Sequence, residues 1–262
     1  MTKLSHNDIY RGPYAHLYEG FSAVFRHADH LFEYLVNRQF MNDSSTCLSI
    51  GSGKGILELM LMEKYSNLKM YLVEPSERYS REFGREARSR NLSSRVMGVS
   101  TNRFQAFDLD ERFDRILSIH SWYGFGNNHE LLQKAMGFLN PEGALFITAV
   151  DEANAAWVEK SGIRKYEWHT GNFSQWLKET GIDHTVDTEL RRIPISSMFD
   201  GDQFTEEGKG VVAFHALVPF EEVSSETKVN FRKAVFDAAI DGDDGQPSVQ
   251  FSFGCITIPA QS

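Results

Sequence analysis

The sequence has few of the features that mark secreted or membrane-embedded chains. Only two cysteines, Cys47 and Cys255, occur among its 262 residues. Both lie in apolar stretches typical of strands, which indicates buried thiols in a reducing compartment. No apolar run reaches the roughly 20 residues of a membrane span, and residues 1–18 lack the apolar stretch of a signal peptide. We therefore expect a cytoplasmic protein that has no membrane partner.

Basic charge is also scarce. The chain has 27 Lys and Arg against 36 Asp and Glu, a formal net charge of −9 at pH 7. A negative field of this size repels phosphate backbones, so nucleic acid is not expected as a partner. Internal repeats and low-complexity segments are absent from the sequence as well. With 41% hydrophobic residues, the chain can fill the core of a single elaborated domain over 1–262, which we expect to be a monomer or a weak homodimer.

Strand and helix patterns alternate through the first part of the chain. Short apolar runs typical of strands occur at 47–50, 70–73, 96–99, 113–119 and 144–150. Helical patterns follow at 56–61, 76–90 and 128–139. This alternation predicts an α/β fold with a doubly wound, mostly parallel sheet of seven strands and helices on both faces.

The two flanks of this core have a different character. Helical spacing of apolar residues over 21–40 predicts a helix, so we interpret residues 1–45 as a helical cap on the substrate side. The acidic stretch 199–210 is expected to be irregular and to belong to a substrate-side insertion over 196–247. A turn at 241–245 followed by alternation over 249–258 predicts a C-terminal antiparallel hairpin at the edge of the sheet.

A glycine cluster follows the first predicted strand, in the string Leu-Ser-Ile-Gly-Ser-Gly-Lys-Gly at 48–55. Glycines allow a sharp turn and a close approach of the backbone to a ligand. A dinucleotide fingerprint would need glycine at Ile56, and a phosphate-binding P-loop would need Ser or Thr at Gly55. The remaining G-x-G-x-G pattern after a strand is typical of methyltransferases that use S-adenosylmethionine. The candidate cofactor residues here are Gly51, Ser52, Gly53 and Gly55.

A carboxylate at the end of the next strand strengthens this interpretation. Glu74 lies 23 residues after Gly51, where an ionised carboxylate can accept hydrogen bonds from both hydroxyls of a ribose. Pro75 and Ser76 complete this part of the predicted cofactor site. Further on, the acid Asp114 enters a strand and the turn 140–143 precedes another, a spacing common after the fourth strand of this fold.

With these segments, the chain resembles the histamine N-methyltransferase family from about residue 21 to residue 260. The resemblance is carried by 48–55, by Val-Glu-Pro-Ser at 73–76, by 116–123, by Asp-Gly-Asp at 200–202 and by Cys-Ile-Thr-Ile at 255–258. It implies a Rossmann-like class I methyltransferase fold and S-adenosylmethionine as cofactor. Position by position, it implies cofactor contacts at Gly51, Glu74, Tyr79, Thr101 and Ile119, although Tyr79 replaces an amide of the family.

The resemblance also implies substrate contacts, at His30, His120 and Phe251. The family has an acid at the first of these positions and amides at the other two, so the chain departs from it at all three, which argues against histamine as the substrate. His120 directly follows the fourth predicted strand, where an imidazole could accept a proton or orient the acceptor atom. We therefore take His120 as the candidate catalytic residue. Trp122, Tyr123 and Phe199 are further candidate pocket walls, although each is also compatible with core packing.

Metal chemistry is not expected, although His27, Asp29 and His30 are close in sequence. On a helix only His27 and His30 would share a face, and no compact ligand cluster is visible. Our first hypothesis is an enzyme that transfers a methyl group from S-adenosylmethionine to a small molecule, at a nitrogen of an amine or amino-acid-like metabolite. The alternatives are O-methylation of a small carboxylate or hydroxyl compound, and a non-catalytic module that only binds the cofactor.

Overall fold

The computed structural model describes residues 15–152, 158–163, 168–242 and 245–261. The chain divides into two compact units, each assembled from several stretches. Unit 1 comprises Met1–Arg26, Val150–Gly171 and Thr188–Gly254, and unit 2 comprises His27–Ala149, Asn172–Asp187 and Cys255–Ser262. The substrate roles predicted for 1–45 and 196–247 stay predictions, and the first 14 residues of that cap lie outside the described residues.

Eight strands form one sheet. The strands are β1 (Thr46–Ile50), β2 (Lys69–Val73), β3 (Val96–Ser100), β4 (Phe113–Ser118), β5 (Leu139–Val150), β6 (Thr185–Pro194), β9 (Ala239–Asp241) and β10 (Pro247–Pro259). The strand order is β3-β2-β1-β4-β5-β10-β6, with β9 paired to β10. The β1–β2, β1–β4, β2–β3 and β4–β5 pairs are parallel. The doubly wound, mostly parallel α/β fold is thus confirmed, with eight strands in place of seven.

The strand order reverses between β1 and β4. From β1 the chain continues outward through β2 and β3, and it then returns to the other side of β1 as β4 and β5. In open α/β sheets, ligands bind outside the carboxyl ends of the strands at such a switch point. The residues after β1, β2, β3 and β4 therefore share the edge of the sheet at which a ligand is expected.

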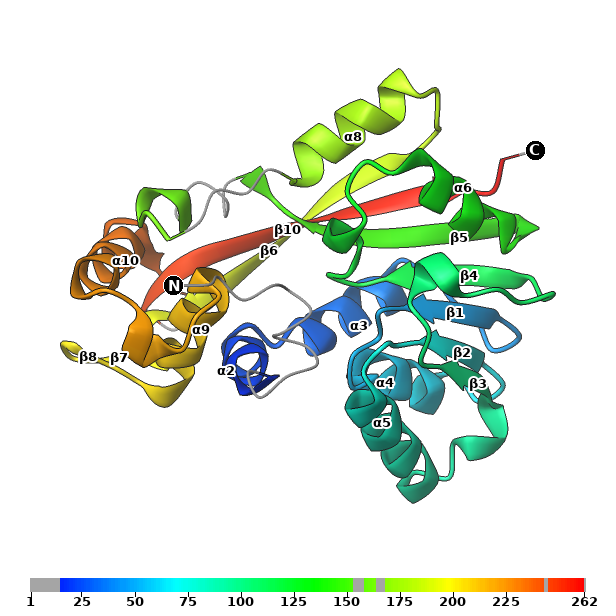
Figure 1. Ribbon diagram of the computed structural model, residues 1–262, viewed down its shortest axis with the longest axis horizontal. Helices are drawn as coiled ribbons and strands as arrows, with labels where there is room; N and C mark the ends of the chain where they lie inside the picture. The colour runs from blue at the N-terminus through cyan, green and yellow to red at the C-terminus, as the bar shows by residue number, and fades with distance from the viewer. Residues whose placement is uncertain (1–14, 153–157, 164–167, 243–244, 262) are drawn as a thin grey trace. The chain divides into compact units, whose positions relative to one another are not determined.

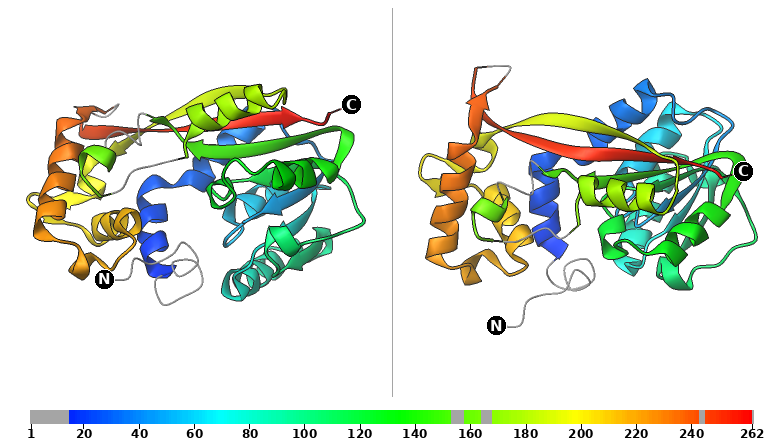
Figure 2. Two further views of the ribbon diagram at one scale, coloured as in Figure 1. Left: turned by 45° about the horizontal axis from the view of Figure 1, so that its top comes forward. Right: turned by 90° about the horizontal axis from the view of Figure 1, so that it is seen from above.

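Helices cover both faces of the sheet in unit 2. They are α3 (His27–Asn37), α4 (Ile56–Lys64), α5 (Glu77–Ser89), α6 (His129–Gly137) and α8 (Thr170–Glu179), the last of which begins in unit 1. Figures 1 and 2 show α4 and α5 on one face and α6 on the other. Side chains define where two of these helices begin: Ser76 accepts the Tyr79 N–H, and Asn128 accepts the Leu131 N–H.

Unit 1 contains α2 (Ala15–Phe25), β7 (Phe199–Asp200), β8 (Gln203–Phe204), α9 (Glu206–Ala216) and α10 (Ser225–Asp237). Helices α2 and α9 approach closely at Gly20 and Gly210, where an added Cβ on Gly210 would lie 2.7 Å from the Gly20 Cα. The stretch 199–210, predicted to be irregular, is a two-stranded hairpin followed by the start of α9. Phe199 packs on Phe204 with 4.8 Å between ring centroids. Such cross-strand aromatic pairs stabilise a hairpin, which explains why this stretch is regular.

Two further expectations need correction. The helix predicted over 21–40 is interrupted at Arg26, whose φ of 43° lies in the left-handed region, so it forms α2 and α3 instead. The C-terminal hairpin of β9 and β10 is antiparallel as predicted, but β10 lies between β5 and β6, so β6 is the edge strand. The single-turn helices are Ser93–Arg95, Phe104–Ala106, Trp122–Gly124, Ile195–Ser197 and Phe220–Glu222.

Both cysteines are free and buried, as predicted for thiols in strands. None of the helices in the described part of the chain is long and apolar enough to cross a membrane.

Candidate active site

The glycine loop connects β1 to α4 at the switch point of the sheet. Gly51, Gly53 and Gly55 all adopt the left-handed conformation, with φ of 70°, 58° and 67°. L-residues with a Cβ rarely adopt this conformation, which explains why the turn alternates glycine with other residues. The loop is fixed to the next strand, because the Gly51 N–H donates to the Val73 carbonyl oxygen at 2.7 Å.

The three glycines differ in what surrounds them. A Cβ on Gly51 would lie 2.5 Å from the Ser121 Cβ, and one on Gly55 would lie 2.4 Å from a ring carbon of Phe83. These two glycines therefore permit close packing within the protein. A Cβ on Gly53 would meet nothing within 4 Å. Gly53 thus faces open space, where a bound molecule can come against the backbone.

Glu74 closes the loop from the end of β2. One carboxylate oxygen accepts the Gly53 N–H at 2.8 Å, and the other accepts the Ser76 N–H at 2.7 Å. Each oxygen of an ionised carboxylate has a second acceptor position, so the group can also take hydroxyl donors from a ligand. Glu74 is buried, and its two hydrogen bonds fix the loop to the segment that follows β2. Its role as a ribose ligand stays a prediction.

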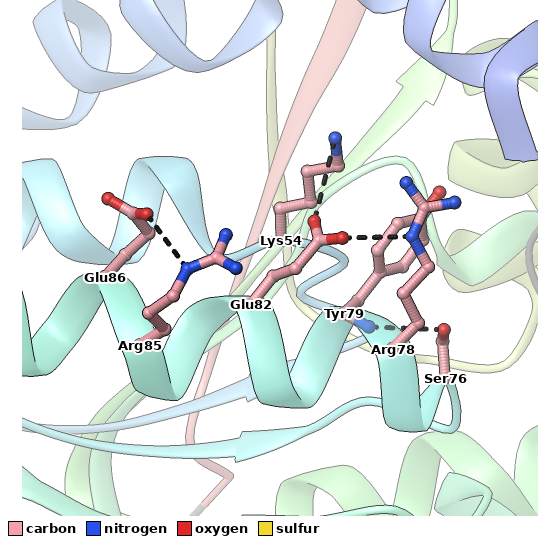
Figure 3. A network of polar contacts seen from close by, with 7 residues as sticks. All are labelled: Lys54, Ser76, Arg78, Tyr79, Glu82, Arg85 and Glu86. Atoms are coloured by element: carbon pink, nitrogen blue, oxygen red, sulfur yellow. Dashed lines mark hydrogen bonds and ion pairs between the residues drawn. The ribbon is translucent and has the colours of Figure 1, made fainter.

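The first turn of α5 adds Tyr79 to this side of the site, as Figure 3 shows. Tyr79 is buried, and Lys54 from the glycine loop lies 5.9 Å from its ring centroid. Lys54 also forms an ion pair with Glu82 at 3.7 Å, and Glu82 pairs with Arg78 at 2.9 Å. The loop and α5 are therefore connected by side chains as well as by Glu74.

The remaining predicted cofactor residues follow the ends of neighbouring strands. Pro75 lies two residues after β2, Thr101 is exposed directly after β3, and Ile119 is half-buried directly after β4. Their common edge agrees with the predicted site. Contacts of these three residues with the cofactor stay predictions.

His120 begins the segment that follows β4, and its backbone is in an unusual conformation. Its φ is 47°, uncommon for a residue with a side chain, and its N–H donates to the Thr148 hydroxyl at 2.8 Å. Such outliers cost free energy and cluster at functional sites. Burial lowers the pKa of His120 to about 4, so its imidazole is uncharged at neutral pH.

A second imidazole faces His120. The His27 ring on α3 lies 4.4 Å from the His120 ring, measured between centroids. Burial, together with the charges of His120 and His30, holds the pKa of His27 well below its ordinary value. His30, on the same helix, is half-buried. The end of β4 and the start of α3 therefore bring His120 close to two histidines that precede it by 90 and 93 residues in the sequence.

Hydrogen bonds attach the His120 segment to the glycine loop. The Ser121 hydroxyl donates to the Ile50 carbonyl oxygen at 2.6 Å, and the Ser118 hydroxyl lies 2.6 Å from that of Ser121. Because the Ser121 proton goes to Ile50, Ser118 is the donor of the second bond. These two hydrogen bonds hold the residues on either side of His120 at the last residue of β1, directly before the glycine loop.

The aromatic residues predicted to line the substrate pocket differ in burial and in packing partners. Trp122 is fully buried and packs on Phe125, with 5.2 Å between ring centroids, whereas Tyr123 is half-buried. Phe199 and Phe251 belong to unit 1, where Phe251 packs on Phe25 at 4.4 Å between centroids. Each of the three buried rings has a packing role, and their substrate contacts stay predictions.

Sequence reasoning missed four residues of this site. Thr148 bonds to His120, 28 residues away, and Ser121 bonds to Ile50, 71 residues away. No local sequence pattern indicates such contacts. The spacing of His27 from His30 indicates a shared helix face but gives no sign that His27 lies beside His120. Glu58 had a visible signal, because it is an acid among the apolar residues of α4.

The loop has the properties expected of a nucleoside site. Besides the open space at Gly53, the Ser52 hydroxyl is buried and has no hydrogen-bond partner among the described residues. Buried polar groups are normally satisfied, so this hydroxyl suits a ligand that provides a polar atom. The residues present therefore fit S-adenosylmethionine. The fold and this site have the features typical of class I methyltransferases that use S-adenosylmethionine.

Comparison with known proteins gives the family. The chain belongs to the methyltransferase domain family, whose model matches residues 23–194. It is 26% identical over 140 residues to (S)-coclaurine N-methyltransferase of Thalictrum flavum subsp. glaucum, a match covering 53% of this chain and 38% of that protein. The chain therefore spans about two fifths of the length of this curated relative.

Solved structures share the fold at low identity. A coclaurine N-methyltransferase bound to N-methylheliamine and SAH superposes with a TM-score of 0.55 and 17% identity, covering 88% of this chain and 72% of that one. The plantazolicin methyltransferase BpumL in complex with SAH gives a TM-score of 0.55 and 13% identity, covering 97% and 93%.

Proposed function

We propose that the protein transfers the methyl group of S-adenosylmethionine to a nitrogen of a small amine or amino-acid-like metabolite. The observation that carries this proposal is the uncharged imidazole of His120, which directly precedes Ser121, whose hydroxyl donates to Ile50 at the end of β1. When bound, the cofactor supplies a sulfonium methyl group that an acceptor lone pair can take by in-line displacement.

The work of the protein in such a displacement is alignment. Correct positioning of two reactants can contribute about 7–11 kcal/mol to the barrier reduction. Glu74 and the Gly53 backbone fix the cofactor side, and the Ser121–Ile50 hydrogen bond fixes the His120 side relative to it. A rigid connection between the two sides is what an alignment mechanism requires.

The pKa of His120 restricts the acceptor. An alkylammonium ion has a pKa of about 10.4, whereas the pKa of His120 is about 4. The imidazole is therefore far too weak a base to deprotonate such an ion. It can instead accept a hydrogen bond from an N–H that is already neutral. We therefore expect a weakly basic amine, uncharged near pH 7, with His120 orienting its lone pair.

Nitrogen as the accepting atom has further support. The sequence resembles the histamine N-methyltransferase family, and the curated relative is named as an N-methyltransferase. His30 and His120 stand in place of the acid and one amide of the histamine family, so a less cationic acceptor than histamine fits them better. The second candidate is O-methylation, since an uncharged imidazole accepts a hydrogen bond from a hydroxyl equally well.

Matched acceptors test the proposal. The purified protein is incubated with methyl-labelled S-adenosylmethionine and sets of related compounds: an aromatic amine, the alkylamine of similar shape, and the corresponding alcohol and carboxylic acid. We expect the label on nitrogen of the weakly basic amine, with less on the alkylamine at pH 7. Label on oxygen alone would contradict N-methylation, and preference for the alkylamine would contradict the role given to His120.

A further inference from the structure

A buried carboxyl group lies directly behind the glycine loop. Glu58 is in the first turn of α4, three residues after Gly55, and only 2% of its surface is exposed. One of its oxygens accepts a hydrogen bond from the Ser49 hydroxyl at 2.6 Å. Ser49 is itself buried in β1, two residues before Gly51. The Ser49–Glu58 bond thus joins the strand that enters the loop to the helix that leaves it.

Glu58 interacts electrostatically with the cofactor side of the site. The groups that shift its pKa come from three elements: Ser49 of β1, the backbone of α4, and Glu74 at the end of β2. Cys47 of β1 lies nearby as well, and Glu58 is one of the causes of its raised thiol pKa, after burial. Helices α3 and α5 pack against α4. Glu74, which accepts the Gly53 N–H, is one of the groups that raise the pKa of Glu58. A charge on Glu58 therefore acts on the carboxylate that closes the glycine loop.

The protonation state of Glu58 is poised near neutrality. Burial raises its pKa to about 7, against the lowering effect of the Ser49 hydrogen bond, and Glu74 raises it further. A cation placed beside the loop favours the ionised form of a carboxyl group. S-adenosylmethionine carries a positive sulfonium, whereas the sulfur of its product S-adenosylhomocysteine is neutral. The two ligands share the other ionisable groups, so they differ in this one charge.

We propose that Glu58 sets the preference of the cofactor site for cationic S-adenosylmethionine over its neutral-sulfur product. Binding of the cation shifts the buried carboxyl group from Glu58–COOH to Glu58–COO⁻ and releases the proton to solvent. After methyl transfer the sulfonium charge is gone, the carboxyl group takes up a proton again, and the product is held less tightly. Glu58 is a positioning and specificity residue in this account, and the inference is independent of the acceptor.

Proton linkage tests this inference by binding alone. Calorimetric titrations of both ligands, in buffers of different ionisation enthalpy between pH 5 and pH 8, give affinities and the number of protons released. If the cation lowers the pKa of Glu58 by about one unit, affinity for S-adenosylmethionine rises about tenfold across this range, with release of about half a proton near pH 6.5. S-adenosylhomocysteine should show a markedly smaller change in affinity.

Two variants separate this effect from loop integrity. Glu58→Gln keeps the shape of the side chain but cannot ionise, so the two ligands should then share one pH dependence. Ser49→Ala removes the hydrogen bond that lowers the pKa of Glu58, so the midpoint of the pH dependence should move upward. Equal pH dependence for the two ligands in the wild type would overturn the inference, as would an unchanged difference between them in Glu58→Gln. Should Glu58→Gln not fold, an unmoved midpoint in Ser49→Ala would overturn it.

Discussion

The two sides of the site in unit 2 are built differently. On the cofactor side, three residues with left-handed φ are glycines, and a carboxylate accepts the backbone N–H of one of them. On the proposed acceptor side, the residue with left-handed φ is His120, whose Cβ makes that conformation costly, and the Thr148 hydroxyl accepts its N–H. The first side achieves its shape through glycine. The second has a strained backbone at His120, and this conformation determines where the imidazole lies.

Buried ionisable groups show the same contrast. Glu58 behind the glycine loop has a pKa raised to about 7, and His120 has a pKa lowered to about 4, in both cases mainly through burial. Burial disfavours the charged form, which raises the pKa of an acid and lowers that of a base. Near pH 7 the imidazole is therefore uncharged, and the carboxyl group lies between its two states. Near neutrality, the protonation of Glu58 therefore changes with pH, whereas that of His120 does not.

The largest expected effect is the loss of cofactor binding after a substitution in the glycine loop. Gly53→Val should abolish measurable binding of S-adenosylmethionine, because a branched side chain would fill the open space at Gly53 and disfavour its φ of 58°. Circular dichroism should show a folded protein, since the added Cβ meets no protein atom. Gly53→Ala is the matched control and should bind with intermediate affinity. Normal affinity in the valine variant would contradict a close approach of ligand to this backbone.

The next effect concerns the acceptor side. His120→Ala should lower kcat/KM by roughly 10²-fold or more, with little change in cofactor affinity, because the acceptor loses its orienting group. His120→Gln should restore much of the activity if orientation is the role, since an amide oxygen accepts the same hydrogen bond. Steady-state kinetics with the true acceptor would measure both.

The pH profile then separates orientation from base catalysis. With a pKa of about 4 for His120, no fall in kcat/KM from its protonation is expected between pH 5.5 and pH 8. A limb near pH 6.5 that disappears in His120→Gln would show an ordinary imidazole acting as a base, contrary to this account.

A smaller loss is expected at Glu74. Glu74→Ala should weaken cofactor binding by about 2–3 kcal/mol, because a charged acceptor is lost and its backbone donors are left unpaired. Calorimetry on the folded variant measures the change, and thermal unfolding checks the fold. Glu74→Gln is the control, since it keeps one acceptor oxygen. Unchanged affinity in the alanine variant would remove Glu74 from the predicted ribose contact.

The smallest expected effect is on the free energy of unfolding, whose pH dependence should differ between Glu58 and His120. The folded-state pKa of Glu58, about 7, exceeds its ordinary value of 4.5, so its contribution to stability is lost as pH rises toward and through 7. The folded-state pKa of His120, about 4, lies below its ordinary 6.5, so its contribution is lost as pH falls from 6.5 toward 4. Between pH 5 and pH 7 the two contributions each change by about 2 kcal/mol in opposite directions.

Single substitutions should reveal these opposing slopes. Relative to the wild type, Glu58→Gln should gain stability on going from pH 5 to pH 7, and His120→Gln should lose it. Urea unfolding at the two pH values measures both differences. Parallel stability profiles for the two variants would contradict the opposite pKa shifts.

The same contrast explains how much the sequence could predict. The glycine loop, Glu74 and the strands around them were located because each has a local signal: apolar runs, glycine spacing and an acid at a strand end. The break at Arg26 has no such signal, since arginine shows no preference for left-handed φ. The insertion of β10 between β5 and β6 and the meeting of His27 with His120 depend on contacts between distant segments, which local patterns do not contain.

The central claim is that the site binds S-adenosylmethionine and passes its methyl group to a small molecule. Incubation of the purified protein with methyl-labelled cofactor and a metabolite extract, followed by mass spectrometry, tests it most directly. The account predicts a labelled small molecule heavier by one methyl group, an equal amount of S-adenosylhomocysteine, and neither product with Gly53→Val. Tight cofactor binding without any labelled small molecule would contradict it and would indicate a module that binds the cofactor without turnover.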